Sequence, residues 1–332
     1  MKTEPADVDP RDLAQVLQEQ WALVPERLQY APVGFGDYHW DITDTAGDRW
    51  FVTVADLRGG WRAAGPAAGY ADLRAALETV TAVRQAGLDF AVAPVATTAG
   101  QVLAALGREH AVTVFPHLDG AAGDFGAELA PADRLVLIGM LAKLHDATPL
   151  VARTAPARSP ALATRPGLDA ALGELDRPWN AGPYGEPARR LLAARAPQLG
   201  RALARFDELA QQAARAGPAV LTHGEPHPGN LLRCGGRLLL IDWDTAGLAR
   251  PERDLWSVVG DDRELAGRYT ALTGRAVSAA GLRLYRLRWS LDDIALSLRD
   301  FRGAHEQTAD TQESWLNLTE LLELILSEQD PL

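Results

Sequence analysis

The sequence predicts an α+β fold in which antiparallel strands come first and a mainly helical region follows. Residues 28–54 alternate short apolar and aromatic runs with glycine-containing turns, which is the pattern of consecutive antiparallel strands. From Pro131 onward the apolar residues recur mainly at helical spacing. Because 47% of the 332 residues are hydrophobic, the chain can build a sizeable core, which argues against global disorder.

The composition limits the classes of partner. A net charge of −11 argues against nucleic-acid binding, which needs basic patches. The single cysteine, Cys234, excludes an internal disulfide framework and a thiolate metal site. Residues 1–12 contain no apolar signal core, and no run of 18 or more apolar residues follows. We therefore expect a cytoplasmic protein without a membrane partner, and its oligomeric state is left open.

Helical and strand periods can be separated in the first 116 residues. Residues 12–20 have helical spacing, with Asp12 as the expected N-cap. A second helix is expected over residues 70–86 and should end at Gly87. The expected strands are residues 28–33, 40–43, 49–54, 90–95 and 110–115.

The remainder is predicted to be mainly helical. A segment rich in alanine, arginine and proline, residues 150–166, is expected to connect helices. The expected helices are residues 131–148, 187–216, 262–272, 279–302 and 311–327.

Two polar clusters lie in apolar surroundings between Leu221 and Trp256. The first is the run HGEPHPGN at residues 223–230, and the second is the run DWD at residues 242–244. Gly235-Gly236 predicts the turn of a hairpin that joins strands 231–233 and 237–241. Because a hairpin brings the ends of its strands together, the polar side chains at these ends should converge. These side chains are Glu225, Asn230 and Asp242.

The converging side chains suggest a metal site beside a spare acid. Two carboxylates and an amide oxygen form a hard oxygen ligand set, which suits Mg²⁺. One of the acids could instead orient or deprotonate a hydroxyl group. Phosphoryl transfer needs both parts, a metal on the phosphates and a group that aims the nucleophile. The alternative is a turn-rich loop whose acids cap neighbouring elements, which explains single residues better than the whole run.

The run from His223 to Asn230, followed by Asp242 after an apolar strand, resembles the catalytic and metal motifs of one enzyme family. This is the aminoglycoside phosphotransferase and choline kinase branch of the protein-kinase-like fold. The resemblance covers most of the chain and implies a two-lobed α+β fold. It implies a nucleotide-binding N-lobe of antiparallel strands over residues 1–116. A mainly helical C-lobe over residues 117–332 would carry the catalytic loop and the substrate site.

The resemblance assigns roles to the residues of the motif. Glu225 stands at the position of the catalytic aspartate, and its extra methylene is a departure from the family pattern. Asn230 and Asp242 stand at the Mg²⁺ ligands. His223 and His227 would hold the shape of the loop. Asp254 matches a structural acid tied to this loop.

The nucleotide site is expected in the N-lobe. A glycine turn at Gly34 and Gly36 would let backbone N–H groups approach phosphate, although an ordinary hairpin turn is the alternative. By resemblance, Pro116, His117 and Leu118 form a hinge that holds the nucleotide base, and a plain loop is the alternative.

The strand at residues 51–54 lacks an expected lysine. By resemblance, Thr53 stands where the family has a lysine that reaches the phosphates and pairs with a helix acid, here Glu78. Arg58 and Arg62 are candidates to replace it, with solvated loop arginines as the alternative. Two outcomes stay open. In the first, the glycine turn and an arginine hold ATP or GTP together with Mg²⁺. In the second, phosphate binding is lost and the protein sequesters a ligand.

The substrate side is expected to include acids. Asp292 and Asp293 are adjacent on a helix and cannot share one face, so one is expected to meet a cationic or hydroxylated substrate. A solvated acid with an arginine partner is the alternative. Asp244 and Trp289 are further candidates beside Glu225, although core packing is the alternative for Trp289.

The resemblance implies transfer of phosphate from a nucleoside triphosphate to a hydroxyl of a small molecule. The expected substrates are antibiotics, namely aminoglycosides, basic peptide antibiotics or nucleoside antibiotics, and the expected role is resistance. A metabolic small-molecule kinase shares every site residue and stays open. A kinase-like protein without catalytic activity that sequesters a ligand also stays open.

Overall fold

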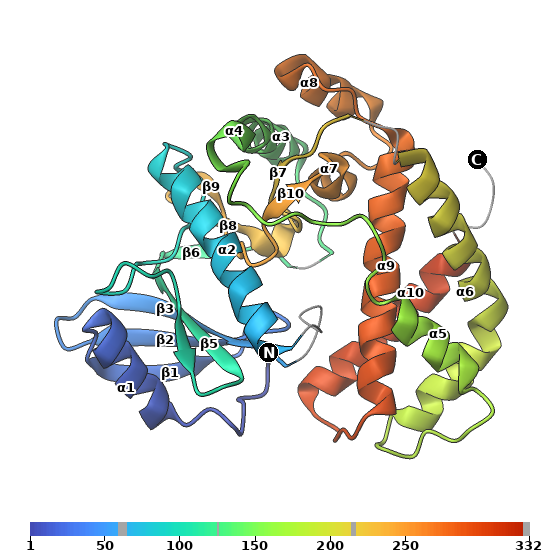
Figure 1. The fold of residues 1–332 in the computed structure, drawn as a ribbon, viewed down its shortest axis with the longest axis horizontal. Coiled ribbons are helices and arrows are strands. Elements are labelled where there is room, and N and C mark those ends of the chain that lie inside the picture. The colour runs from blue at the N-terminus through green and yellow to red at the C-terminus, as the bar shows by residue number, and fades with distance from the viewer. Residues whose placement is uncertain (59–64, 125, 214–216, 328–332) are drawn as a thin grey trace. The chain divides into compact units, whose positions relative to one another are not determined.

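The computed structural model describes residues 1–58, 65–124, 126–213 and 217–327, and the chain divides into two compact units. Unit 1 consists of Met1–Ser159 and Gly217–Val277. Unit 2 consists of Pro160–Ala216 and Ser278–Leu332. Figure 1 shows the path of the chain through both units. The predicted lobe boundary after residue 116 falls inside unit 1, so the assignment of two lobes to residues 1–116 and 117–332 stays a prediction.

A five-stranded antiparallel sheet forms the N-terminal part of unit 1, in the order β1-β2-β3-β5-β4 (Figure 1). One face of this sheet is apolar, and its buried side chains on β2, β3, β4 and β5 share a core with α1. Its strands are β1 (Pro25–Ala31), β2 (Tyr38–Asp44), β3 (Arg49–Asp56), β4 (Ala104–Leu106) and β5 (His110–Pro116). The helix α1 (Pro10–Trp21) contributes Leu13, Leu17 and Trp21 to the shared core. The strand residues that lie between these buried ones point to the opposite face of the sheet.

Two predictions for this region are wrong, namely the N-cap of the first helix and the strand at residues 90–95. The N-cap of α1 is Asp9, whose carboxylate accepts a hydrogen bond from the Arg11 amide at 2.8 Å, and Asp12 lies in the first turn. Residues 90–95 form no strand, because they make only a single parallel bridge from Ala91 to Leu240. Pro94 has no N–H to extend that pairing. The sheet edge is formed by β4 instead, which the prediction missed because it has only three residues.

The second part of unit 1 holds the predicted hairpin. The strands β8 (Leu231–Cys234) and β9 (Arg237–Leu240) pair antiparallel, with Gly235 and Gly236 at φ +55° and +77° in the turn. This confirms the predicted hairpin, since a two-residue turn with positive φ at both positions favours glycine. A third strand, β6 (Gly120–Ala122), pairs with β8, and β7 (Val220–Thr222) pairs with β10 (Gly247–Ala249). The helices of unit 1 after α1 are α2 (Pro66–Gln85), α3 (Pro131–Asp146), α4 (Thr148–Val151), α7 (Glu252–Val259) and α8 (Arg263–Thr273).

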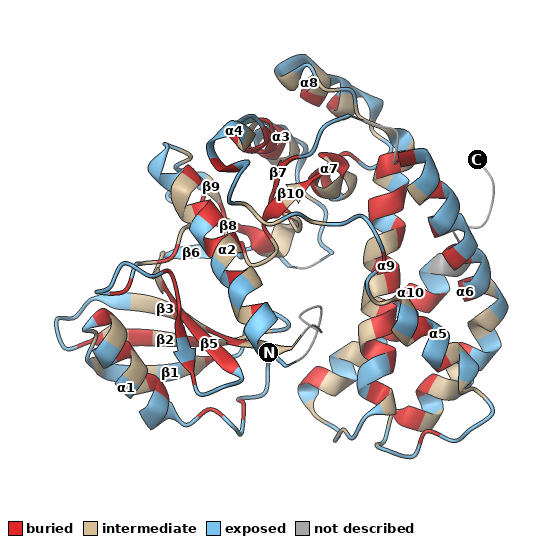
Figure 2. Cartoon of the chain, in the orientation of Figure 1, coloured by how far each residue is buried: buried red, intermediate tan, exposed pale blue. Residues whose placement is uncertain are grey.

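Unit 2 is a helical bundle around α9 (Ala279–Arg302). Buried residues recur along the whole length of α9 (Figure 2), because helices pack against it on several sides. These helices are α5 (Arg165–Gly173), α6 (Gly185–Ala213) and α10 (Ala309–Ser327). Leu291, Ile294 and Phe301 of α9 are in the same core cluster as Leu199 and Phe206 of α6. Across the described ranges, no helix is long and apolar enough to span a lipid bilayer.

Candidate active site

The loop that begins at His223 is anchored to a buried carboxylate. Asp254 on α7 is 0% exposed and accepts hydrogen bonds from the amides of His223 at 2.9 Å and Gly224 at 2.6 Å. His145 on α3 contacts the same carboxylate through Nε2 at 3.1 Å, and its Nδ1 lies 2.7 Å from the Tyr269 hydroxyl. Burial opposes ionisation, but the hydrogen bond from His145 holds the pKa of Asp254 below its usual value. A charged Asp254 therefore fixes the start of the loop.

His223 connects the loop to the end of β9. Its Nε2 donates to the Ile241 carbonyl at 2.8 Å, and its Nδ1 accepts from the Glu225 amide at 3.2 Å. Gly224 has φ +109°, and a Cβ at this position would overlap the Arg253 guanidinium and the Thr245 hydroxyl. Only glycine fits there, so the backbone can pass between these side chains. The loop shape is therefore set by backbone bonds and close packing.

Acidification should destabilise the native protein through His223. Burial lowers the pKa of His223 to about 4, whereas an unfolded histidine has a pKa of about 6.5. Between these values the unfolded chain binds a proton that the native protein does not, so the free energy of unfolding falls as the pH falls. This difference in pKa corresponds to a loss of about 3 kcal/mol in the free energy of unfolding at pH 4. Urea unfolding at pH 7, 5.5 and 4.5 measures this slope, and the His223→Asn variant should have a flatter one. Equal slopes in both proteins would contradict the prediction.

The hairpin brings the three predicted chemical residues to one end of the strands. The Asn230 Nδ2 donates to the Glu225 carbonyl at 2.9 Å. The Ile241 amide donates to the Asn230 carbonyl at 3.1 Å, which places the residue before Asp242 opposite Asn230. Asp242 itself is exposed and has φ +62°, a left-handed conformation that is uncommon outside glycine and is often found at functional sites.

The residues present fit a divalent cation. The amide nitrogen of Asn230 is committed to the loop, so the amide oxygen is the side-chain atom that would ligate a cation. In the part of the chain that the structure describes, no group of three or more His, Cys, Asp or Glu residues could hold a metal ion. This excludes a cage of such side chains there. One carboxylate and one amide oxygen match Mg²⁺, which keeps several waters and takes its remaining ligands from substrate phosphates.

The glycine turn lies between β1 and β2. Gly34 and Gly36 have φ +71° and +100°, and Phe35 between them is 64% exposed. Glycine has no side chain, so the backbone of the turn is bare on either side of Phe35 and a phosphate could approach it closely. In the structure this backbone contacts Met1, because the Gly36 amide donates to Met1 Sδ at 3.3 Å and the Met1 amino group donates to the Gly34 carbonyl at 3.1 Å. Thr53 on β3 is hydrogen-bonded to His39 on β2, with 3.1 Å between Thr53 Oγ1 and His39 Nδ1.

Two predicted nucleotide-binding residues have other partners in the structure. Arg58 forms ion pairs with Asp56 and Asp7, each at 2.7 Å, and with Glu109 at 3.2 Å. Three carboxylates thus already neutralise its charge. Glu78 is on the exposed side of α2, 3.8 Å from Arg74 one turn away. We therefore retain neither Arg58 nor Glu78 in the candidate phosphate site. The other predicted arginine, at position 62, lies outside the described residues.

The predicted hinge connects the five-stranded sheet to the hairpin sheet. The chain leaves β5 at Pro116 and enters β6 at Gly120. The His117 amide donates to the Arg49 carbonyl at 3.3 Å, and the Arg49 guanidinium contacts the His117 ring and the Asp119 carboxylate, each at 2.8 Å. These contacts fix the backbone of the connection. Binding of the nucleotide base at Pro116, His117 and Leu118 stays a prediction.

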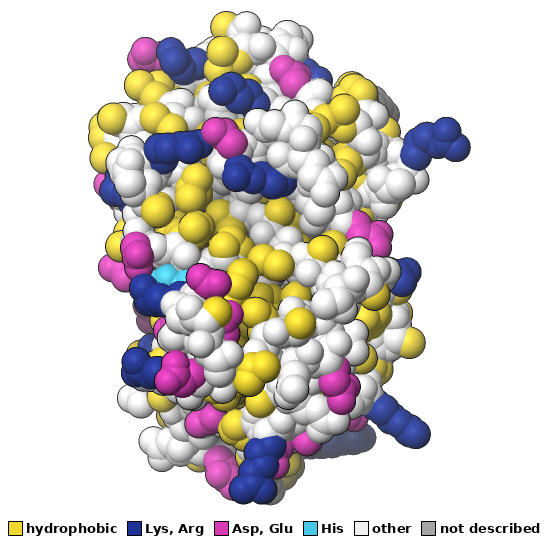
Figure 3. All heavy atoms as spheres, turned by 90° about the vertical axis from the view of Figure 1, so that its left-hand side faces the viewer, with side chains coloured by type: hydrophobic (Ala, Val, Ile, Leu, Met, Phe, Trp, Pro, Cys, Tyr) yellow, Lys and Arg dark blue, Asp and Glu magenta, His cyan; other side chains and the backbone are white. Residues whose placement is uncertain are grey.

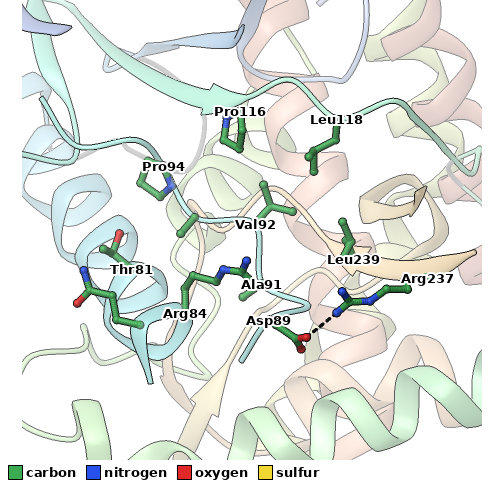
Figure 4. A pocket seen from close by; sticks show the side chains of 12 residues that line it. Thr81, Arg84, Asp89, Ala91, Val92, Pro94, Pro116, Leu118, Arg237 and Leu239 are labelled. Atoms are coloured by element: carbon green, nitrogen blue, oxygen red, sulfur yellow. Dashed lines mark hydrogen bonds and ion pairs between the residues drawn. The ribbon is translucent and has the colours of Figure 1, made fainter. Parts of the chain in front are cut away.

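A hollow of about 360 Å³ borders this connection. In Figure 4 Pro116 and Leu118 line it together with Val92, Pro94 and Leu239, while Arg237 and Asp89 form an ion pair at its edge. Figure 3 shows a face on which hydrophobic side chains gather in a hollow, with charged side chains around them. No residue of the run 223–230 and no part of Asp242 lines the 360 Å³ hollow. We therefore place none of the phosphate chemistry in it.

An arginine that the sequence analysis missed ties α2 to the segment after Asp242. Arg158 Nη1 contacts both carboxylate oxygens of Asp72 on α2, at 2.8 and 2.7 Å. Its Nη2 and Nε donate to the Ala246 carbonyl at 2.9 and 3.1 Å. No local pattern signals this role, because Arg158 is one of several arginines in a proline-rich connection.

The Arg158–Asp72 pair should contribute to stability more than an exposed ion pair does. Its side chains are 14% and 33% exposed, so solvent screens it only in part. A double-mutant cycle with Arg158→Ala and Asp72→Ala should give a coupling energy of about 1–2 kcal/mol. The matched control is the more exposed pair Arg165–Asp169 on α5, for which we expect about 0.3–0.5 kcal/mol. Urea unfolding measures both cycles, and equal coupling energies would contradict the prediction.

The predicted substrate residues are divided between the units. Glu225 and Asp244 are in unit 1, whereas Trp289, Asp292 and Asp293 are on α9 in unit 2. Asp292 accepts from the Thr164 hydroxyl at 2.6 Å and from Arg288 Nε at 3.2 Å. Burial raises the pKa of Asp292, and Arg288 acts in the opposite direction. Trp289 packs against the core of unit 2. Whether these residues share one site with Glu225 stays a prediction.

Comparisons with known proteins agree with this geometry. The sequence profile described as the phosphotransferase enzyme family matches residues 27–289. Protein StrN of Streptomyces griseus is 30% identical over 261 residues, which is 74% of this chain and 76% of that protein. A spectinomycin phosphotransferase in complex with ADP and spectinomycin matches with a TM-score of 0.73 at 16% identity, over 97% of this chain and 98% of that one. An amicoumacin kinase in complex with AMP-PNP, Ca²⁺ and its ligand matches with a TM-score of 0.53 at 15% identity, over 97% and 94%.

The fold is thus the two-lobed, kinase-like α+β fold, with an antiparallel sheet in its N-terminal region and a mostly helical remainder. The chain belongs to the phosphotransferase enzyme family. It is a small-molecule kinase that uses an alcohol group as acceptor. The predicted fold class and family are confirmed.

Proposed function

We propose that this enzyme transfers the γ-phosphate of ATP or GTP, bound with Mg²⁺, to a hydroxyl of an antibiotic and so confers resistance. The observation that carries the proposal is that Asn230 bonds to the Glu225 carbonyl and lies opposite Ile241, the residue before Asp242, at one end of the β8–β9 hairpin. An acid beside a cation site is what phosphoryl transfer requires. The similarity to a spectinomycin phosphotransferase supports an antibiotic as acceptor.

Each of these residues has a distinct task in the proposed reaction. Asn230 and Asp242 would hold the cation, which would neutralise negative charge on the phosphate groups of the nucleotide. Glu225 orients the acceptor hydroxyl and accepts its proton. Its backbone is fixed at both ends, because its amide donates to His223 and its carbonyl accepts from Asn230. This matters because a displacement of about 1 Å can cost on the order of 10²-fold in rate.

The acceptor is proposed to carry amino groups as well as hydroxyls. The chain has a net charge of −11, and the candidate substrate residues include several acids. These are Glu225, Asp244, Asp292 and Asp293. Carboxylates attract a cationic substrate and discriminate against anionic ones. Aminoglycosides and basic peptide antibiotics have this chemistry, and nucleoside antibiotics are the less cationic class in the proposal.

One residue bears on the alternatives to this function. Thr53 stands where the resemblance implies a phosphate-binding lysine, which favours ligand sequestration without turnover, but membership of the phosphotransferase enzyme family favours turnover. A metabolic small-molecule kinase would use the same site residues and differ only in its acceptor.

Isothermal titration of the purified protein with ATP and with GTP, each with Mg²⁺, tests the proposal. We expect one of them to bind. That donor is then supplied to a panel containing spectinomycin, aminoglycosides, basic peptide and nucleoside antibiotics, choline and ethanolamine, and the products are identified by mass spectrometry. Phosphorylation of choline or ethanolamine alone would make the resistance role wrong. Failure of both nucleotides to bind, with the antibiotics present, would favour sequestration.

A further inference from the structure

A row of polar side chains crosses the face of the five-stranded sheet that α1 does not cover. His39 on β2 is opposite Thr53 on β3, which is opposite Thr113 on β5. The neighbouring row, Trp40, Val52 and Val114, points to the other face and is fully buried in the core with α1. Because strand residues alternate between faces, the polar row is a property of one face only.

Two contacts orient the His39 ring, and its Nε2 faces the glycine turn. Its Nδ1 lies 3.1 Å from Thr53 Oγ1. Its ring stacks on Phe51 with 5.1 Å between centroids and 24° between planes. Its Nε2 lies 3.1 Å from the position that a Cβ on Gly34 would occupy. The Nδ1 edge of the ring thus faces Thr53, at the position of the missing lysine. The Nε2 edge faces the glycine turn.

The contact with Thr53 occupies Nδ1 and leaves Nε2 as the ring nitrogen that can serve a ligand. When the Thr53 hydroxyl donates to Nδ1, the ring proton is on Nε2, the atom beside Gly34. Burial lowers the pKa of His39 to about 4, while the Asp37 carboxylate acts to raise it and the Met1 amino group acts to lower it. At neutral pH the ring is thus an uncharged donor of one hydrogen bond.

We propose that His39 donates a hydrogen bond from Nε2 to a phosphate group of the bound nucleotide, in the place of the lysine that Thr53 replaces. Thr53 is the positioning residue that fixes the tautomer. The inference rests on the proposed function, since it presupposes that a nucleotide binds at the glycine turn. It also explains how the site works without Arg58, whose charge is neutralised by Asp56, Asp7 and Glu109.

A matched pair of variants tests the role of Nε2. The amide nitrogen of His39→Gln can replace an Nε2–H donor, whereas the shorter His39→Asn reaches only to the Nδ1 position. We measure by titration the affinity of each variant for the triphosphate that binds the wild type, with Mg²⁺, and for its nucleoside. His39→Asn should weaken triphosphate binding about tenfold, as expected for loss of one hydrogen bond to a charged group, and leave nucleoside binding unchanged. His39→Gln should stay within about threefold of the wild type.

A second measurement does not depend on variants. The ¹⁵N chemical shifts of the His39 ring should identify Nε2 as protonated in the free protein and should change at Nε2 on addition of the nucleotide. Unchanged ring shifts, or equal losses of triphosphate and nucleoside affinity in His39→Asn, overturn the inference. Wild-type affinity in His39→Asn overturns it as well, while the proposed function stands. Absence of nucleotide binding by the wild type overturns the proposed function and this inference together.

Discussion

Replacement of Asp242 by asparagine should lower kcat by about 10³-fold while the protein remains folded. Metal ions supply several kcal/mol of charge stabilisation in the transition state, and each 1.36 kcal/mol is a factor of ten in rate. An amide carries no charge, so the variant would hold the cation weakly. Asparagine is the appropriate substitution because it tolerates φ +62° better than most residues. Steady-state turnover with the identified acceptor measures the effect.

The control for this prediction is Asp300→Asn. Asp300 is an exposed aspartate at the end of α9, paired with Arg299, and it belongs to unit 2. Its replacement removes the same charge from the chain and should leave kcat unchanged. Affinity for the triphosphate should fall in Asp242→Asn when Mg²⁺ is present and should differ little between the two variants when it is absent. Full turnover by Asp242→Asn would show that the cation is held elsewhere.

Replacement of Asp254 by alanine should lower the free energy of unfolding by about 3–5 kcal/mol. The carboxylate accepts from the amides of His223 and Gly224 and contacts His145. His223, His145 and Asp254 are fully buried, and Gly224 is half-buried. Removal of one member of a buried charged network leaves its partners without hydrogen bonds, which costs this much. Urea unfolding at pH 7 measures the loss.

Asp261→Ala provides the matched comparison. Asp261 is exposed in the connection between α7 and α8, so its replacement should change the free energy of unfolding by at most about 0.5 kcal/mol. Because Asp254 holds the first residues of the catalytic loop, its loss should also reduce turnover at temperatures where the variant is still folded. A cost below about 1 kcal/mol for Asp254→Ala would mean that water or another residue satisfies the two amides.

The hairpin that carries the candidate residues could be predicted because its signal is local. A Gly-Gly turn between two apolar strands defines that Asn230, before the first strand, lies near Asp242, after the second. The chemical roles of Glu225, Asn230 and Asp242 stay a prediction. The longer helices were predicted for a similar reason, since their periodicity is local, whereas the short helices α4, α5 and α7 were missed. Errors were made where the local signal was weak. The N-cap of α1 was placed three residues too late, and residues 90–95 were taken for a strand.

The supporting contacts could not be predicted because their partners are far apart in the chain. His145 and Asp254 are 109 residues apart, and Arg158 and Asp72 are 86 apart. Asp56 is two residues from Arg58, but nothing near Arg58 indicates that Asp7 and Glu109 neutralise it as well. Nothing near His39 indicates that its ring lies between Thr53 and Gly34.

The sequence by itself determined the family, the fold class and the longer helices, because these depend on short-range patterns. Only the tertiary structure decided which charges are available to a ligand and which residues hold the loop in place. The physical reason is that a charge can be neutralised, and a ring oriented, by any residue that packing brings within hydrogen-bond distance, whatever its distance along the chain.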